Sequence, residues 1–218
     1  MPLTIDRTIP RGEASSAVLV FPRGVADLHV CAGGTEHLAS GTFSAGRPPE
    51  ITSSRGTLSV RYRRGVGRAR GELRLNPEVE WSIESHSGAS GLTADLTGLQ
   101  LAGVRLAGGA SRVWLDLPRT AQPVPIEFAR GAHRVNITRP ADVGAVLQIR
   151  DGASSLVFDD EQLGAVSGEL RLESTTRGVA GEYQITARRG VSRLSVSIGR
   201  VGRVPFDGSC PRGEDSVI

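Results

Sequence analysis

The densest charge in the sequence lies in one arginine-rich stretch, RYRRGVGRARGELR. Its arginines could bind phosphate or carboxylate groups of an anionic polymer or a membrane surface through paired N–H donors. They are Arg61, Arg63, Arg64, Arg68, Arg70 and Arg74. Alternatively, the stretch is a hairpin whose outward arginines keep an exposed sheet edge soluble. Because only Tyr62 offers a ring for base stacking, nucleic acid is the least expected partner.

A second set of candidate residues combines carboxylates with an aromatic ring. Asp95 and Asp116 recur at the same point of a repeat, and Trp114 stands two residues before Asp116. Such a ring beside carboxylates can bind a sugar or a partner's arginine.

The aspartates could instead hold a calcium ion. Asp159 and Thr138 occupy the equivalent positions of two further repeats, so the four residues are expected to form a column of oxygen ligands. However, exposed carboxylates on neighbouring strands repel by only about 1 kcal/mol in water, and Arg112 and Arg134 are near enough to soften that repulsion. No ion is needed to explain the column, and we predict neither a metal nor another cofactor.

Residues for catalysis are sparse. His29, Cys31 and His37 could bind a metal, but alternation places His29 and Cys31 on one strand face, where packing is the commoner role. A glycan-cleaving enzyme would need clustered acids and bases, and we expect no lysine or histidine beside the aspartates. The sequence therefore predicts a protein that is not an enzyme. Cys31 and Cys210 lie far apart and are expected to be reduced, with a single bridge between them as the alternative.

The element that must position these residues is a repeat of about 21 residues. Gly-Ala dipeptides begin at Gly88, Gly109, Gly131 and Gly152, which are 21, 22 and 21 residues apart. With each glycine as offset zero, apolar residues follow at offsets 4 and 6 in all four repeats and at offset 8 in the first two, and a second apolar pair follows near offsets 16 to 19. Alternation with a period of two predicts two strands per repeat, each with one buried face.

Units of this size bury their inner faces only by stacking on one another. We therefore predict an all-β fold in which two-strand rungs form a solenoid-like, two-sided sandwich with almost no helix. The glycine is expected to supply the turn conformation at each corner. GVADLHV (24–30) and GVSRLSVSI (190–198) show the same signature, and residues 36–75 contain further strands. We predict one domain over residues 1–205, with regular rungs at 88–158, a hairpin excursion at 168–188 and a loose polar tail at 206–218.

Composition limits the classes of protein further. The chain has 218 residues, 28 glycines and a formal net charge of +3, and all 26 of its basic residues are arginine. So small a net charge gives no argument for nucleic-acid binding. Since neither a signal peptide nor 18 consecutive apolar residues is present, we expect a soluble chain, cytoplasmic or peripheral at the bacterial envelope.

Trp114 stands at offset 5, between two inward positions, so its side chain should point away from the core. One interpretation is that the N-terminal strands or the 168–188 hairpin cover it. The other is an exposed aromatic anchor beside Asp95 and Asp116.

Several motifs resemble those of one family. LRLNP (73–77), GASGLTADLTGL (88–99), GGASRVWLDLP (108–118) and the closing YQITARRGVSRLSVSI (183–198) are similar to the soluble domain of the LiaF-like, cell-wall-active-antibiotics-response or toast-rack proteins. The resemblance covers roughly residues 15–200. It implies an all-β, solenoid-like domain of bacterial envelope-stress systems or adhesins that acts through interaction. Family members often carry transmembrane helices before this domain, and this chain is expected to have none.

These observations predict a non-catalytic interaction or scaffold module with a protein or an anionic envelope polymer as its partner. A self-assembling β-solenoid scaffold is one alternative, because solenoid ends expose sheet edges and a homo-oligomer could form there. A glycan-binding or glycan-cleaving solenoid is the other.

Overall fold

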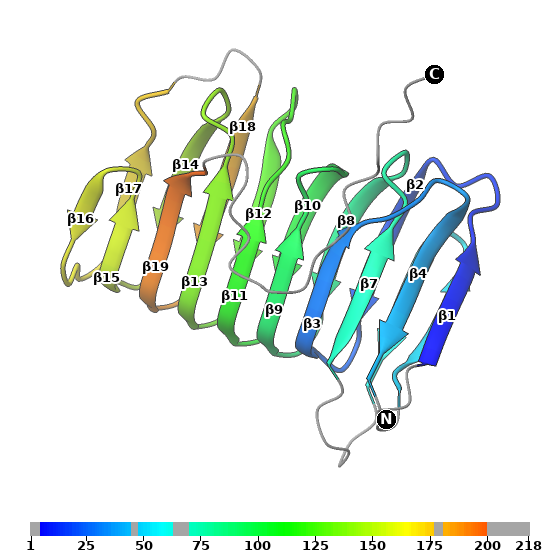
Figure 1. The fold of residues 1–218 in the computed structure, drawn as a ribbon. Helices are drawn as coiled ribbons and strands as arrows, with labels where there is room; N and C mark the ends of the chain where they lie inside the picture. The colour runs from blue at the N-terminus through cyan, green and yellow to red at the C-terminus, as the bar shows by residue number, and fades with distance from the viewer. Residues whose placement is uncertain (1–4, 45–47, 63–69, 177–180, 200–218) are drawn as a thin grey trace.

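The computed structural model describes residues 5–44, 48–62, 70–176 and 181–199. All regular elements in these residues are strands, and they form two sheets that face each other along the length of the molecule (Figure 1). The predicted all-β, two-sided sandwich is confirmed. The proposed single domain over residues 1–205 and tail at 206–218 stays a prediction, because residues 200–218 lie outside the described ranges.

Ten strands form the first sheet, which we call sheet A. Its strand order is β1-β4-β7-β3-β9-β11-β13-β19-β15-β16. In that order the strands are Ile5–Pro10, His37–Phe43, Gly71–Leu75, Val25–Ala32, Ala89–Asp95, Ala110–Asp116, Ala132–Arg139, Val191–Ile198, Ala153–Phe158 and Glu161–Leu163.

Nine strands form the second sheet, sheet B, in the order β17-β14-β18-β12-β10-β8-β2-β6-β5. In that order the strands are Leu170–Glu173, Gly144–Ile149, Glu182–Ala187, Val124–Phe128, Gln100–Leu106, Glu80–Ser85, Ser16–Phe21, Thr57–Arg61 and Glu50–Ser54.

Each rung consists of one strand of sheet B followed by one strand of sheet A, with a glycine corner between most of them. The rungs β2/β3, β8/β9, β10/β11, β12/β13, β14/β15 and β18/β19 turn at Gly24, Gly88, Gly109, Gly131, Gly152 and Gly190. Neighbouring rungs are parallel and in register, so Ala110 pairs with both Ala89 and Ala132. The corners are joined by backbone hydrogen bonds, since the amide of Ala89 donates to the carbonyl of Gly109 (2.9 Å) and that of Ala110 to the carbonyl of Gly131 (3.1 Å).

The stack does not follow chain order at the end that contains β14 to β19. Rung β18/β19 lies between β12/β13 and β14/β15, although β14/β15 comes earlier in the chain. The expected hairpin at 168–188 is therefore wrong: β17 pairs antiparallel with β14, and β18 pairs parallel with β14 on its other side. The alternation correctly predicted both segments to be strands. However, β17 and β18 pair with opposite edges of β14 and not with each other.

Antiparallel strands close the ends of the stack. At one end β4 and β1 extend sheet A and β5 extends sheet B; at the other end β16 and β17 do the same. β16 has three residues and β17 has four, and both carry charged residues. Short, charged edge strands are a common protection against edge-to-edge association.

The inner faces of both sheets form one continuous apolar core. At offsets 4 and 6, Val113, Leu115, Val135 and Ile137 are all buried, as is Ile126 of sheet B. These are the positions that the repeat alignment assigned to the core, so the predicted inward faces are confirmed.

A left-handed residue stands at offset 3 of each of these six rungs. Offset 3 is occupied by Asp27, Gly91, Arg112, Arg134, Ser155 and Arg193, and all six have positive φ angles, between 48° and 69°. The reason lies in the pattern of burial: offsets 1 and 4 are both buried, although an extended strand would turn them to opposite faces. One left-handed residue between them turns the side chain at offset 4 back to the same face as the side chain at offset 1.

Most of the corner glycines do not supply the turn conformation that was expected of them. Among the six, only Gly24 and Gly152 have positive φ, so a special turn conformation is not the general reason for glycine. Close approach between rungs explains the glycine at Gly24 and just before the corner at Gly108, where an added Cβ would lie 2.3 Å and 2.0 Å from the carbonyl oxygens of Gly88 and Ser87.

The LRLNP motif has a structural explanation in Asn76. This buried side chain donates from Nδ2 to the carbonyls of Thr35 and His37, both at 2.8 Å, and accepts from the amide of Glu78 at 2.9 Å. Its own carbonyl accepts from Nε1 of the buried Trp81 (2.9 Å). Asn76 therefore fastens the loop before β4 to the start of β8.

A buried ion pair interrupts the apolar column at offset 8. Where neighbouring rungs have Leu96 and Leu117, β13 ends in Arg139, whose side chain is 0% exposed. Its guanidinium lies 2.6 Å from Oδ2 of Asp159 and donates to the carbonyl of Val143 at 2.5 Å. The repeat alignment gave no sign of this pair.

The left-handed column predicts opposite responses at two adjacent, exposed serines. Ser155→Gly should raise the free energy of unfolding by about 0.5–1 kcal/mol, because a left-handed conformation strains a residue that has a Cβ. Ser154→Gly, at an ordinary strand position, should lower it by about 0.5–1 kcal/mol. Urea denaturation measures both, and a change of the same sign in the two variants would contradict the assignment.

The Arg139–Asp159 pair predicts a non-additive response. Asp159→Asn should lower the free energy of unfolding by about 3 kcal/mol, because it leaves a buried guanidinium without its counter-charge. Adding Arg139→Leu, the residue type of the neighbouring rungs, should recover most of that loss. A double variant no more stable than Asp159→Asn in the same denaturation experiment would refute this account.

Candidate functional site

The outer face of sheet A carries the aromatic and acidic residues that the sequence singled out. Trp114 is half-buried in the centre of β11 and pairs in register with Thr93 of β9 and Asn136 of β13. Two residues further along the same strands, Asp116 pairs with Asp95. We call the patch formed by these five residues the Trp114 surface.

The segments expected to cover Trp114 lie elsewhere. β1 is the edge strand of sheet A, separated from β11 by β4, β7, β3 and β9. β17 and β18 belong to sheet B, on the opposite side of the core (Figure 1). That interpretation is wrong. β1 and β17 are edge strands and β18 lies inside sheet B, so none of them packs on the outer face of sheet A.

The two aspartates of the Trp114 surface are held differently. Asp95 accepts hydrogen bonds from the Oγ1 (2.6 Å) and the amide (3.2 Å) of Thr97, which fixes the turn after β9. Asp116 accepts from Oγ1 of Thr138 on the next strand. Burial raises the pKa of Asp116, the negative charge of Asp95 raises it further, and the hydrogen bond from Thr138 opposes both.

A histidine lies near these carboxylates, which the sequence did not predict. The charge of His29 lowers the pKa of Asp116, so the expectation that no histidine adjoins the aspartates is wrong. The side chain of His29 is only 14% exposed, and its Nδ1 lies 3.9 Å from Oε2 of Glu72 on β7. Parallel stacking brings it there, since His29 shares offset 5 with Thr93 and Trp114.

Arg112 does not neutralise the aspartates as expected. Its guanidinium donates to Oγ of Ser90 at 3.1 Å and lies 3.9 Å from Oδ1 of Asp27. The left-handed backbone at offset 3 places its side chain nearer the glycine corner than the aspartates. Asp95 and Asp116 therefore remain a pair of stacked carboxylates.

The predicted arginine cluster is placed only in part. Arg61 is exposed at the end of β6 and Arg70 is exposed just before β7, whereas Arg63, Arg64 and Arg68 lie outside the described residues. β6 and β7 belong to different sheets, so the alternative of a hairpin is wrong. Anion binding by this cluster stays a prediction.

Metal ligands and cysteines complete the survey of predicted sites. In the described ranges, no three histidine, cysteine, aspartate or glutamate side chains are grouped so as to hold a metal ion. Cys31 is buried on β3. Cys210 is outside the described ranges, so pairing of the two cysteines stays open.

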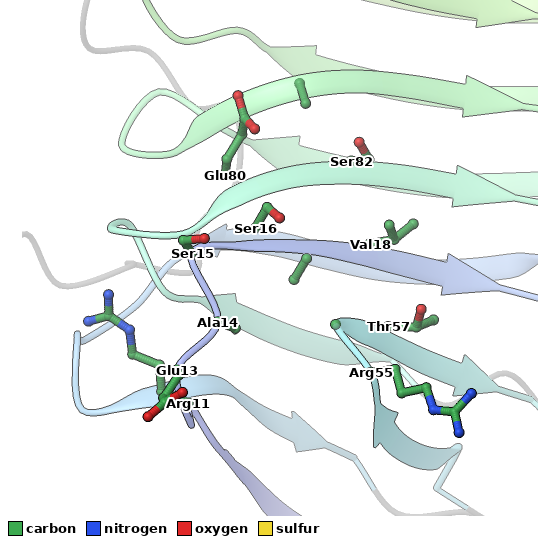
Figure 2. Close-up of a pocket in the computed structure, with 13 residues that line it drawn as sticks. Arg11, Glu13, Ala14, Ser15, Ser16, Val18, Arg55, Thr57, Glu80 and Ser82 are labelled. Atoms are coloured by element: carbon green, nitrogen blue, oxygen red, sulfur yellow. The ribbon is translucent and has the colours of Figure 1, made fainter.

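A polar hollow of about 730 Å³ lies on the outer face of sheet B. Figure 2 shows Glu80 on one side of strand β2 and Arg55 on the other, with Ser15 and Ser16 between them. Its other polar lining residues are Arg11, Glu13, Thr57 and Ser82. Sequence reasoning missed this hollow because its residues come from four separate segments that only the stack brings together.

A family comparison accounts for the repeat and the motifs. The profile of the N-terminal domain of toast_rack, DUF2154, matches residues 3–138. The chain belongs to the toast-rack family. The resemblance predicted from LRLNP and the glycine-initiated rungs is therefore confirmed.

Further comparisons place the toast-rack chain among known proteins. It is similar in structure to a putative cell adhesion protein from Clostridium sporogenes, with a TM-score of 0.64 and 16% sequence identity over 91% of this chain and 100% of that one. At this identity the similarity concerns the fold. A search of curated proteins gave no match. Among the described residues, no helix is long and apolar enough to cross a membrane.

The stacked carboxylates of this toast-rack domain predict a specific pH dependence. The pKa of Asp116 should lie above 3.8, fall in Asp95→Asn and rise in Thr138→Val. Because the folded state then binds the proton more tightly than the unfolded state, the contribution of Asp116 to stability falls as the pH rises from 3.8 to its folded pKa.

NMR titration of the carboxyl groups measures the pKa of Asp116 in wild type, Asp95→Asn and Thr138→Val. Denaturation from pH 4 to pH 7 provides the second test: wild type should lose stability relative to Asp116→Asn over this range. A pKa of Asp116 that is unchanged in Asp95→Asn would show that the two carboxylates are not coupled.

Proposed function

We propose that this toast-rack domain is a non-catalytic interaction module that binds a protein or an envelope polymer, and that the Trp114 surface contacts an arginine or a sugar ring of that partner. The observation that carries the proposal is the position of Trp114. Its large ring stands on a sheet face among Thr93, Asn136 and two carboxylates, where leaving part of the ring in water is unfavourable unless a partner covers it. Aromatic residues of this kind are frequent anchors of interfaces.

The setting that we propose is the bacterial envelope, in stress sensing or adhesion, at the periphery of the membrane or wall. Family membership supports this, as does the similarity to a protein that bears the name of a putative cell adhesion protein. The long stack of parallel rungs also forms broad, continuous sheets (Figure 1), which suits binding of an extended partner more than chemistry.

The arrangement of the ionisable groups supports a module without catalytic activity. Both aspartates of the Trp114 surface are engaged by threonines, and Asp95 is used to fix a turn. His29, the nearest candidate base, is largely buried and directed to Glu72. A catalytic acid and base need access to a substrate on the same side of the sheet.

Self-assembly as a scaffold has less support than partner binding. The alternative requires open sheet edges at the ends of the stack, but the short strands β16 and β17 occupy the edges of one end. Their charged residues oppose strand addition by a second copy.

Replacing the anchor tests the proposal. Trp114→Ala should lower the free energy of unfolding by only about 1 kcal/mol, since its main contacts are cross-strand pairs. It should lower binding to envelope membranes or purified wall polymer at least tenfold in a sedimentation assay. Val157→Ala is the matched control, because Val157 occupies the same outward column on β15.

A second readout separates binding from catalysis. In a Trp81→Phe background, Trp114 is the only tryptophan, and bound partner should protect its fluorescence from iodide. Equal binding by wild type and Trp114→Ala would overturn the choice of surface. Release of new reducing ends from wall polysaccharide above background would overturn the non-catalytic assignment.

A further inference from the structure

The glycine corner carries a column of arginines from three successive rungs. Arg112, Arg134 and Arg193 occupy offset 3 of β11, β13 and β19, which are neighbouring strands of sheet A. Their flanking residues pair in register, with His133 opposite both Ser111 and Ser192. The three side chains therefore start about 4.8 Å apart along the stack.

A second row of arginines stands beside this column. Arg130 and Arg189 directly precede the corner glycines Gly131 and Gly190, and both are exposed. Together with Gly109, Ala129 and Gly131 they line a hollow of about 610 Å³. The absence of side chains on the glycines leaves room for a ligand to lie against the backbone.

Much of this positive charge is not neutralised within the described part of the chain. Arg189 lies 3.9 Å from Asp151, and Arg112 lies at the same distance from Asp27. Arg130, Arg134 and Arg193 form no hydrogen bond or ion pair with another described residue. Like charges gathered along one edge repel one another, and a ligand with several negative charges would relieve that repulsion.

We propose that this arginine corner, which comprises Arg112, Arg130, Arg134, Arg189 and Arg193, binds a linear polysaccharide that bears a carboxylate on each sugar. Guanidinium groups bind carboxylates through two parallel N–H donors. A hexose in an extended chain is about as long as one rung step of about 4.8 Å, so a chain that lies along the stack places about one sugar beside each arginine. None of these five residues or of those lining the hollow is aromatic, which disfavours nucleic acid, since single strands need stacking rings.

The arginine corner is distinct from the Trp114 surface. Trp114 and the aspartates occupy offsets 5 and 7, whereas the arginines stand at offset 3 and directly before the corner glycines. Each surface can therefore be removed while the other is kept, and either proposal can fail alone.

Binding of polygalacturonate, measured by calorimetry at several NaCl concentrations, tests the proposal. The triple variant Arg130→Gln, Arg134→Gln, Arg193→Gln should bind at least tenfold more weakly than wild type. Its plot of log K against log salt should be shallower by about two, because each lost contact removes about 0.7 from the slope for a single-stranded polyanion. Trp114→Ala should bind polygalacturonate as wild type does.

The matched control is Arg7→Gln, Arg55→Gln, Arg119→Gln, which removes the same charge from exposed positions away from the corner. It should retain binding, and fully methyl-esterified polymer should not bind wild type. The proposal is overturned if wild type does not bind, if the control loses as much affinity as the corner variant, or if the esterified polymer binds equally. Tighter binding of a single-stranded oligonucleotide or of anionic vesicles would overturn it as well. Unchanged thermal unfolding of both triple variants shows that a loss of binding is not a loss of fold.

Discussion

The in-register hydrogen bonding between parallel rungs is the constraint on which the rest of the molecule depends. A corner amide such as that of Ala89 reaches the carbonyl of Gly109 only if the two rungs superimpose residue for residue. In this register, residues at the same offset of successive rungs lie in a column. The apolar columns form the core, and the left-handed residues form a column at one bend of the strands. A rung that slipped by one residue would lose its burial and its bend together.

The same constraint creates the surfaces. Asp95 and Asp116 meet because they share an offset, and so do Arg112, Arg134 and Arg193, although 81 residues separate the first and last of these arginines in the chain (193 − 112). Outward offsets are free of packing demands, and they therefore carry the residues that distinguish this chain from any other stack of rungs.

Repetition explains how much of this structure could be predicted from the sequence. The period and alternation predicted the rungs, the burial of Leu115 and Ile126, and the outward column of Trp114 and the aspartates, since each depends on local pattern. Three features depended on tertiary competition instead. β18 pairs with β14 and β12 instead of forming the expected hairpin with β17. Arg139 replaces leucine at a position where Asp159 can neutralise it. The hollow beside Glu80 and Arg55 is assembled from distant segments. Aligning offset 3 across all six rungs would have revealed the arginine column.

The out-of-order position of rung β18/β19 bears on how the chain folds during synthesis. When residues up to β15 have left the ribosome, rung β14/β15 still lacks its permanent neighbour, because β18/β19 must come to lie between it and β12/β13. Growth of the stack along the nascent chain is therefore expected to stop at β13. We expect β18 and β19 to join the two sheets last, through contacts between residues far apart in sequence, a topology associated with slow folding.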